Sequence, residues 1–277
     1  ARMLLFGGRG PAGTGPGGAS ADLWALPVPY DLTPPSEPWT LVTTPSTPPQ
    51  VGGAAAIYIP GRDTVILFTA VTTASGEELA VFEFRFDDWT GLSGSWHQLA
   101  PVIGPDDEMG DPLRAHHYGQ AVYDADRQRV ILFGGWTEPR DAPPHYGWTN
   151  DVIFLNLAAG GDGVLVGRLA PPAVAPRSHF GALFDDVRDR MVVYGGGNPT
   201  DGTLTDVWQL GFDAGAYGTW TSVAQIPDPT YDVPPQRENF TFAVDPFRER
   251  AIIFGGLLTG EPWGTDPRPA TDQVWEM

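Results

Sequence analysis

The stretch Ile131-Leu132-Phe133-Gly134-Gly135 decides the fold, because its pattern returns along the chain. An apolar strand ends in an aromatic residue followed by two glycines at residues 4–8, 131–135, 192–196 and 252–256. A fifth copy, Ile66-Leu67-Phe68-Thr69-Ala70, keeps the strand and lacks the glycines. The aromatic residues stand at 6, 68, 133, 194 and 254, so their spacings are 62, 65, 61 and 60 residues. A regular period of this kind predicts a repeat architecture with one structural unit per repeat.

Further elements keep register with the glycine pair. Before it lies a hairpin turn, Asp-x-x-Arg-x-Arg, in which the acid accepts turn N–H groups and the arginines lie at the solvent end. Copies of this turn begin at Asp124, Asp185 and Asp245. After the glycines comes a third strand that an acid or amide introduces, at Asp22, Asp151, Asp206 and Asp272-Gln273. A fourth strand carries a tryptophan at 39, 96 and 220, and residues 164–166 form a version without one.

Four short strands, a glycine pair after the second and a tryptophan in the fourth together resemble the kelch repeat, which is one blade of a β-propeller. The resemblance covers nearly the whole chain, and its departures are Thr69-Ala70 in the second repeat and the missing tryptophan near Val164. We therefore expect an all-β, kelch-type β-propeller of about five repeats, as in the central domain of galactose oxidase. A lone four-stranded antiparallel blade leaves apolar faces exposed, so blades must stack around an axis, with tryptophans of the third and fourth strands between them.

One β-propeller domain is expected over residues 1–277, with repeats at approximately 1–47, 48–112, 113–173, 174–233 and 234–277. Arg2 stands four residues before Phe6, as Arg129 does before Phe133, so the sequence starts inside a hairpin turn. Met277 falls in the third strand of the last repeat. We expect the first and last repeats to be incomplete and the chain to be a piece of a longer one with six or seven blades, within the usual range of about four to eight. The alternative is a five-bladed ring with two thin blades.

Composition excludes several classes of function. The formal net charge is −18 and all 16 basic residues are arginine, which disfavours nucleic-acid binding because that function needs a basic surface. The acidity indicates either a solvated surface or, alternatively, calcium binding or a salty habitat. The chain has no cysteine, so it has neither a disulfide nor a thiolate nucleophile. The copper chemistry of galactose oxidase, which depends on a cysteine-linked tyrosine, is excluded for the same reason. No apolar run reaches the length of a membrane helix, so we expect no membrane span in this segment.

The segments that lead into the first strand of each repeat hold the first group of candidate binding residues. In kelch propellers these segments share a face with the loops between the second and third strands, and the resemblance directs the search there. The candidates combine arginine with histidine, acid or amide: Arg114, His116, His117, Arg177, His179, Arg237, Glu238 and Asn239. Arginine presents a planar fork to oxyanions, so the group suits a carboxylate, a sulfate or an acidic peptide. Alternatively, the arginines are strand-entry residues and the histidines bond to carbonyls of neighbouring blades.

The long loops after the glycine pairs and one acidic segment hold the remaining candidates. The loops carry aromatic or imidazole side chains at Trp136, His145, Tyr146, Trp148 and Trp263. Such residues either stack on sugars and anchor protein partners or form a small core for the loop itself. A weak calcium candidate consists of Asp106, Asp107, Glu108 and Asp111, but its spacing is not that of a known calcium loop, so a solvated acidic turn is preferred. A metal site of His116, His117 and His179 would require the three side chains to converge.

Two hypotheses of function follow. The first is a non-catalytic module or accessory subunit that binds a protein partner through the loop face, as most kelch propellers do. The second is a carbohydrate-binding protein or carbohydrate-directed enzyme, similar to bacterial kelch proteins that act on sialic acid (mutarotases), with arginine holding a carboxylate and histidine moving protons. Neither a Gly-x-Ser-x-Gly elbow nor a His-Glu-x-x-His sequence occurs, and no cofactor is implied. The lysine-free composition and the Asp-x-x-Arg-x-Arg turn resemble kelch proteins of GC-rich bacteria, many of them exported, which predicts a periplasmic or extracellular location.

Overall fold

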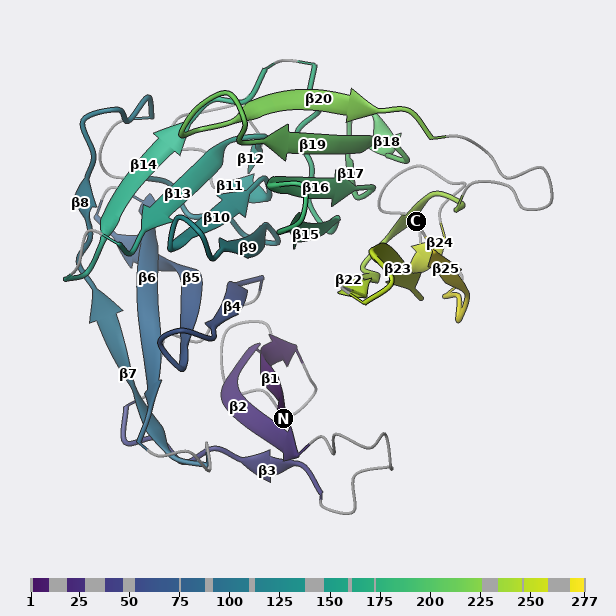
Figure 1. Cartoon of the computed structure of the whole chain (residues 1–277). Helices are drawn as coiled ribbons and strands as arrows, with labels where there is room; N and C mark the ends of the chain where they lie inside the picture. Colours follow the sequence, from purple (N-terminus) through teal and green to yellow (C-terminus); the bar gives the residue numbers. More distant parts are fainter. Residues whose placement is uncertain are drawn as a thin grey trace.

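The computed structural model describes residues 2–9, 19–27, 38–46, 53–74, 76–87, 92–109, 113–137, 147–158, 161–171, 173–225, 234–245, 247–258 and 270–276. All regular structure in these ranges is β-strand. Five antiparallel sheets stand around a common axis in chain order, and the prediction of an all-β propeller with about five blades is confirmed (Figure 1). No helix that would cross a membrane occurs in the described ranges.

Each blade is built mainly from one sequence repeat, and one short strand of the second repeat joins the third blade. The first blade contains β1 (Arg2–Arg9), β2 (Ala19–Pro27) and β3 (Thr40–Leu41). The second contains β4 (Ala55–Ile59), β5 (Thr64–Thr73), β6 (Gly76–Phe86) and β7 (Gly94–Leu99). The third contains β9 (Gln120–Asp124), β10 (Arg129–Phe133), β13 (Val152–Asn156) and β14 (Val164–Arg168), with β8 (Val102–Ile103) added in parallel to β14. The fourth contains β15 (Gly181–Asp185), β16 (Arg190–Tyr194), β19 (Val207–Gly211) and β20 (Thr219–Val223). The fifth contains β22 (Thr241–Asp245), β23 (Arg250–Phe254) and β25 (Val274–Glu276).

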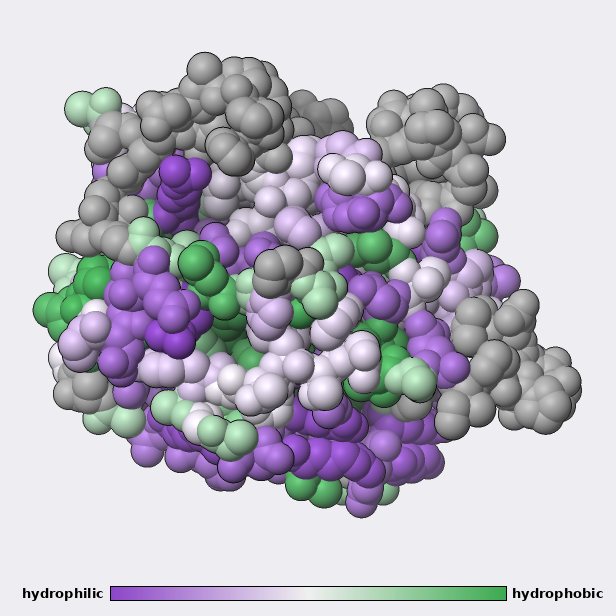
Figure 2. All heavy atoms as spheres, turned by 90° about the horizontal axis from the view of Figure 1, so that it is seen from above, coloured by the Kyte–Doolittle hydropathy of each residue, from purple (hydrophilic) through white to green (hydrophobic). Residues whose placement is uncertain are grey.

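Small two-stranded sheets stand at one end of three blades, beyond the second strand. They are β11 (Trp136–Thr137) with β12 (Gly147–Trp148), β17 (Gly197–Asn198) with β18 (Gly202–Thr203), and β21 (Arg237–Glu238) with β24 (Leu257–Leu258). The first strands of four blades, β4, β9, β15 and β22, lie innermost and next to one another (Figure 1). Seen from the side, hydrophilic residues gather along one rim, and hydrophobic residues form separate small patches (Figure 2).

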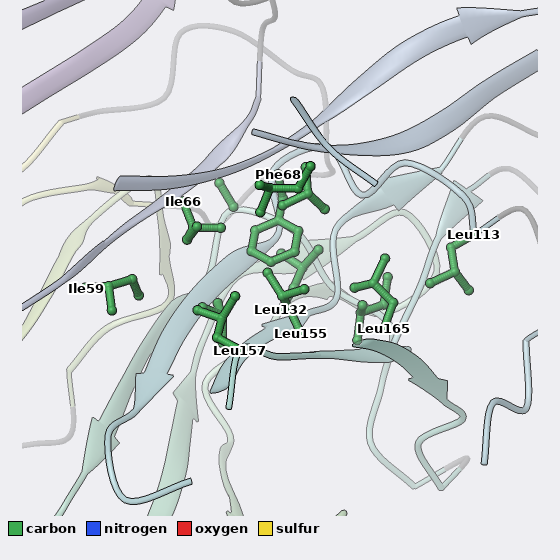
Figure 3. Packing of buried hydrophobic residues seen from close by; sticks show 13 residues of the cluster. Ile59, Ile66, Phe68, Leu113, Leu132, Leu155, Leu157 and Leu165 are labelled. Atoms are coloured by element: carbon green, nitrogen blue, oxygen red, sulfur yellow. The ribbon is translucent and has the colours of Figure 1, made fainter. Parts of the chain in front are cut away.

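The core lies between blades, because the second strand of an internal blade is buried on both faces. In β10, Val130 and Leu132 pack toward the second blade, whereas Ile131 and Phe133 pack toward the fourth. Figure 3 shows Leu132 beside Phe68 in the core between the second and third blades. Successive strand side chains point to opposite faces of a sheet, so a continuous apolar run is what a strand between two such cores requires.

The predicted position of the fourth-strand tryptophans holds for two of them. Trp96 is buried between the first and second blades, with its ring 5.1 Å from Phe6 and 5.0 Å from Phe84. Trp220 packs 4.9 Å from Phe133 of the preceding blade. Trp39, in contrast, is 39% exposed.

The glycine pairs turn the chain out of the blade. Gly134 and Gly135 have φ angles of +61° and +101°, in the region that favours glycine. A Cβ on Gly135 would lie 2.6 Å from the carbonyl oxygen of His117. In the second repeat, where Thr69-Ala70 replaces the pair, β5 continues without a break and pairs with β6 as far as Thr73. Losing the glycines therefore lengthens a hairpin and leaves the blade intact.

The Asp-x-x-Arg-x-Arg turn of the third blade contacts the fourth blade, which differs from the expected placement of both arginines at the solvent end. In the other two turns Arg188 and Arg248 are exposed, as expected. Arg127 donates from both terminal nitrogens to Asp189 of the next blade, each at 2.6 Å. Arg129 is buried, donates from Nε to Asp124 at 2.8 Å, and lies 4.3 Å from the ring centre of Phe212. An arginine in this turn therefore stabilises an interface between blades by charge-assisted bonds and by contact with aromatic rings.

Candidate binding face

The lead-in segments and the loops after the second strands lie side by side on one face of the propeller, as expected. The backbone N–H of His117 donates to the Trp136 carbonyl at 2.8 Å, and the reciprocal bond is 2.7 Å. Ser178 and Gly197 exchange the same pair of bonds at 3.1 Å in the fourth blade. We call this end of the molecule the loop face; it carries the three small sheets.

A chain of three backbone hydrogen bonds joins four blades on the loop face. Tyr118, His179 and Asn239 have φ angles of 57°, 58° and 55°, and Gly53 has +86°. Tyr118 N–H donates to Gly53 at 2.7 Å, His179 N–H to Tyr118 at 3.3 Å, and Asn239 N–H to His179 at 3.1 Å. The sequence analysis missed this chain of bonded residues. Its four members are 65, 61 and 60 residues apart, the same spacings as those of the aromatic residues at 68, 133, 194 and 254.

Two of the candidate arginines are fully buried and hold the blade together. Arg177 donates to both carboxylate oxygens of Asp206 at 2.7 and 2.8 Å and to the Gly195 carbonyl at 3.1 Å. Arg237 repeats this in the fifth blade, with bonds to the Gly255 carbonyl at 3.0 Å and to Gln273 at 3.3 Å. These contacts agree with the alternative that the two arginines are strand-entry residues of the blade. Neither guanidinium is placed to form an open, oxyanion-binding ring.

His116 occupies the corresponding position in the third blade. The positive-φ residues Tyr118, His179 and Asn239 align the three blades with one another. The residues two positions before them are His116, Arg177 and Arg237, respectively. Nδ1 of His116 lies 2.7 Å from the Gly134 carbonyl, as Arg177 Nη1 lies against Gly195. The sequence pattern grouped Arg114 with the other arginines. That grouping was out of register by two residues, since Arg114 is exposed and its backbone bridges to Glu78 of the second blade.

Burial shapes the electrostatics of these pairs. Desolvation lowers the pKa of His116 below its usual value, and the nearby Asp151 opposes that effect only in part. Burial raises the pKa of Asp206, but the hydrogen bonds and charge of Arg177 together with the hydrogen bond from Trp208 outweigh it and keep the pKa below the usual range. His116 is therefore a neutral imidazole at pH 7, whereas Asp206 is a paired carboxylate.

Half-buried aromatic and imidazole side chains gather on the loop face of the third and fourth blades. Trp136 and Trp148 face each other across the β11–β12 pair. Trp148 Nε1 donates to Ser178 Oγ at 2.9 Å, and Ser178 Oγ lies 2.9 Å from His179 Nδ1. The His179 ring stacks on Tyr118 with centroids 4.5 Å apart. Two tryptophans are thus fixed next to polar atoms on rigid strands, which suits recognition of a ligand that has both apolar and polar parts.

His117 belongs to the same group and contacts an acidic side chain of the second blade. Its Nε2 lies 2.6 Å from Glu77 in β6, the strand that the missing glycine pair lengthens. The His117 ring lies 5.6 Å from Trp136. His116, His117 and His179 are therefore directed to three different partners, and no group of His, Asp or Glu able to hold a metal ion occurs among the described residues.

The acidic segment of the weak calcium candidate lies against the third and fourth blades. Asp106 accepts from the Tyr217 hydroxyl at 2.8 Å, and Asp107 accepts from the Gly167 N–H at 2.7 Å. Glu108 pairs with Arg168 at 2.8 Å. Four predicted site residues, Asp111, His145, Tyr146 and Trp263, lie outside the described residues, whereas Glu238 is buried in β21 and Asn239 is exposed.

Comparison with known proteins identifies the fold. No protein-family model and no curated protein matches the sequence. The chain is similar to the solved structure of YjhT, with a TM-score of 0.57 and 14% identity over 94% of this chain and 70% of that one. A protein provisionally named as an exo-beta-1,3-galactanase from Bifidobacterium bifidum s17 aligns over 76% of this chain and 63% of its own, with 13% identity and a TM-score of 0.44. The first likeness agrees with the propeller architecture, and the second is too distant to add to it.

Proposed function

We propose that this chain is a kelch-type propeller that acts as a non-catalytic binding module and holds a protein partner on its loop face. The supporting observation is the pair of half-buried tryptophans, Trp136 and Trp148, held in register on β11 and β12. Indole side chains contribute most to protein interfaces when rigid neighbours hold them in place, and here Ser178 and His117 do so. An accessory role in a larger, exported complex is the biological setting that we propose for the module.

The kelch assignment rests on details of the blade. Trp208 Nε1 donates to the Asp206 carboxylate at 2.7 Å, and Trp275 Nε1 to Gln273 at 3.2 Å. The third-strand tryptophan, the acid or amide before it and the arginine of the lead-in segment therefore form one repeated unit. That unit recurs beside each glycine pair of the fourth and fifth repeats, in the register from which we predicted kelch blades.

A carbohydrate is the second candidate ligand, and the same tryptophans favour it because indole faces stack on sugar rings. The version of this hypothesis in which an arginine holds the carboxylate of an acidic sugar is less favoured. Arg177 and Arg237 are buried, and their guanidinium groups already donate hydrogen bonds to Asp206, Gln273 and backbone carbonyls. A neutral sugar would need none of those guanidinium groups.

The test compares complexes of three forms of the natural protein purified from its source. We expect Trp148→Ala to lose the bound partner, as measured by the mass of the intact complex and of its dissociated components. Phe247→Ala is the matched control, because Phe247 is a 94% exposed aromatic residue in the turn at the opposite end of its blade. If the partner remains bound to the Trp148→Ala variant and is lost from the Phe247→Ala variant, the proposal is contradicted. A bound glycan in place of a protein would support the second candidate.

A further inference from the structure

The third blade departs from the fourth at an acidic residue on the loop face. In the fourth blade, Asp206 receives hydrogen bonds from the Arg177 guanidinium and from the Trp208 indole. The residues in the corresponding positions of the third blade are His116 and Ile153, and Ile153 has no donor to offer. Within the described residues, no hydrogen bond reaches the carboxylate of the half-buried Asp151. Asp151 has therefore lost both donors that hold Asp206.

His116 supplies a second acceptor at the same place. The carbonyl of Gly134 can only accept, so Nδ1 of His116 must donate to it, and the imidazole is the Nδ1–H tautomer. Nε2 then has a lone pair and no hydrogen, and it has no partner in the described part of the chain. His116 is only 3% exposed, and an unpaired polar atom at that depth is costly. Two acceptors, one neutral and one anionic, thus have no protein donor among the residues that the structure describes.

We infer that this position of the third blade binds the guanidinium group of an arginine from the protein partner, between His116 Nε2 and the Asp151 carboxylate. The inference rests on the proposed function and names the chemistry of the partner. The fourth blade shows that the arrangement fits a guanidinium, since Arg177 lies between the corresponding acid and carbonyl. In the third blade the shorter imidazole bonds to the carbonyl, and the acid is left for a guanidinium that enters from outside.

The surroundings favour a cation at this position. Trp148 stands three residues before Asp151 at the edge of the small sheet, and indole rings attract guanidinium groups. The net charge of −18 attracts a basic partner and repels an acidic one. A guanidinium offers several N–H donors in one plane, so it can serve an imidazole nitrogen and a carboxylate together, which a compact ammonium does less well.

The test uses purified protein and N-acetylarginine amide as the probe. Binding is measured by NMR from the ring-nitrogen shifts of His116 and the indole N–H shift of Trp148. We expect a saturable shift at both groups with a dissociation constant on the order of millimolar, as befits one side chain. N-acetylcitrulline amide, which has the same shape without the charge, should bind at least about tenfold more weakly.

Three variants decide the location. Asp151→Asn removes the carboxylate. His116→Arg places a guanidinium of the chain itself in the site, as Arg177 does in the fourth blade. Both variants should abolish the arginine-dependent shift at Trp148. Asp126→Asn is the charge-matched control, since Asp126 is exposed in the turn at the other end of the same blade. Binding that survives His116→Arg, or that is equal for the arginine and citrulline probes, overturns the inference, as does a folded wild-type protein that shows no shift.

The two proposals fail in different ways. If the partner leaves Trp148→Ala but arginine does not bind the purified wild-type protein, the module stands and the guanidinium site is wrong. If arginine binds in the predicted way and the partner is retained by Trp148→Ala, the site is real and the loop face is not where the natural partner docks.

Discussion

Replacing Arg177 by methionine tests whether the buried arginine is part of the blade framework. The change removes two bonds to Asp206, one to Gly195 and one, at 3.1 Å, to Ala175, while the apolar volume is largely kept. Breaking a buried ion pair costs about 3–5 kcal/mol. The side chain of Asp206 is 38% exposed and regains water, so we expect the lower end, about 3 kcal/mol.

The assay is urea unfolding followed by tryptophan fluorescence, with the midpoint compared at an unchanged slope. A loss of this size should also lower the melting temperature by about 6–12 °C. Arg188→Met is the control, because Arg188 pairs with Glu249 at 3.2 Å and with Asp185 at 3.3 Å on the surface, so its loss should leave the urea midpoint nearly unchanged. Equal losses for the two variants would refute the structural role assigned to Arg177.

Three further predictions concern other features of the blades. Gly135→Ala places a Cβ 2.6 Å from the His117 carbonyl at φ +101° and should cost about 2–4 kcal/mol in urea unfolding, whereas Gly161→Ala, with open space around it, should cost about 1 kcal/mol. Thr69→Gly with Ala70→Gly should cost about 1–2 kcal/mol and speed hydrogen exchange at Val71, because β5 runs unbroken through this point; unchanged exchange would contradict a continuous hairpin. Burial lowers the pKa of His116, so the unfolded chain binds its proton first. The free energy of unfolding should therefore fall as pH drops through about 6.5, by up to about 1.4 kcal/mol per unit, and His116→Gln should remove that part of the slope.

The strand framework could be predicted from the sequence because a blade must bury both faces of its second strand. The run Val130 to Phe133 is apolar without alternation for that reason, and the glycines after it are needed for positive φ. Other features depend on contacts between repeats. Arg127 reaches Asp189, and Arg129 lies against Phe212, so a repeat read alone placed both arginines at the solvent end.

The sequence predicted where the candidate site lies but not what each of its residues does. The lead-in segments do meet the loops that follow the glycine pairs, but one repeat holds a histidine where the next two hold arginines. Residue type alone therefore aligned Arg114 with Arg177, although the 61-residue spacing of Phe133 and Tyr194 aligns His116 with Arg177. The positive φ of Tyr118 and His179 agrees with that spacing. Asp151 was read as the first residue of a strand, because the donors to Asp206 become visible only in the structure, and only then do His116 and Ile153 mark their loss.

Photo-cross-linking from the loop face tests the central claim most directly. A benzophenone amino acid replaces Thr200, which is exposed in the turn between β17 and β18, so that Trp148 is kept in the natural protein in its source cells. The same amino acid at Phe247 serves as the control. The account predicts a cross-link from position 200 to one protein partner and none to that partner from position 247. A partner cross-linked from position 247 and not from position 200 would contradict the assignment of the loop face as the binding surface.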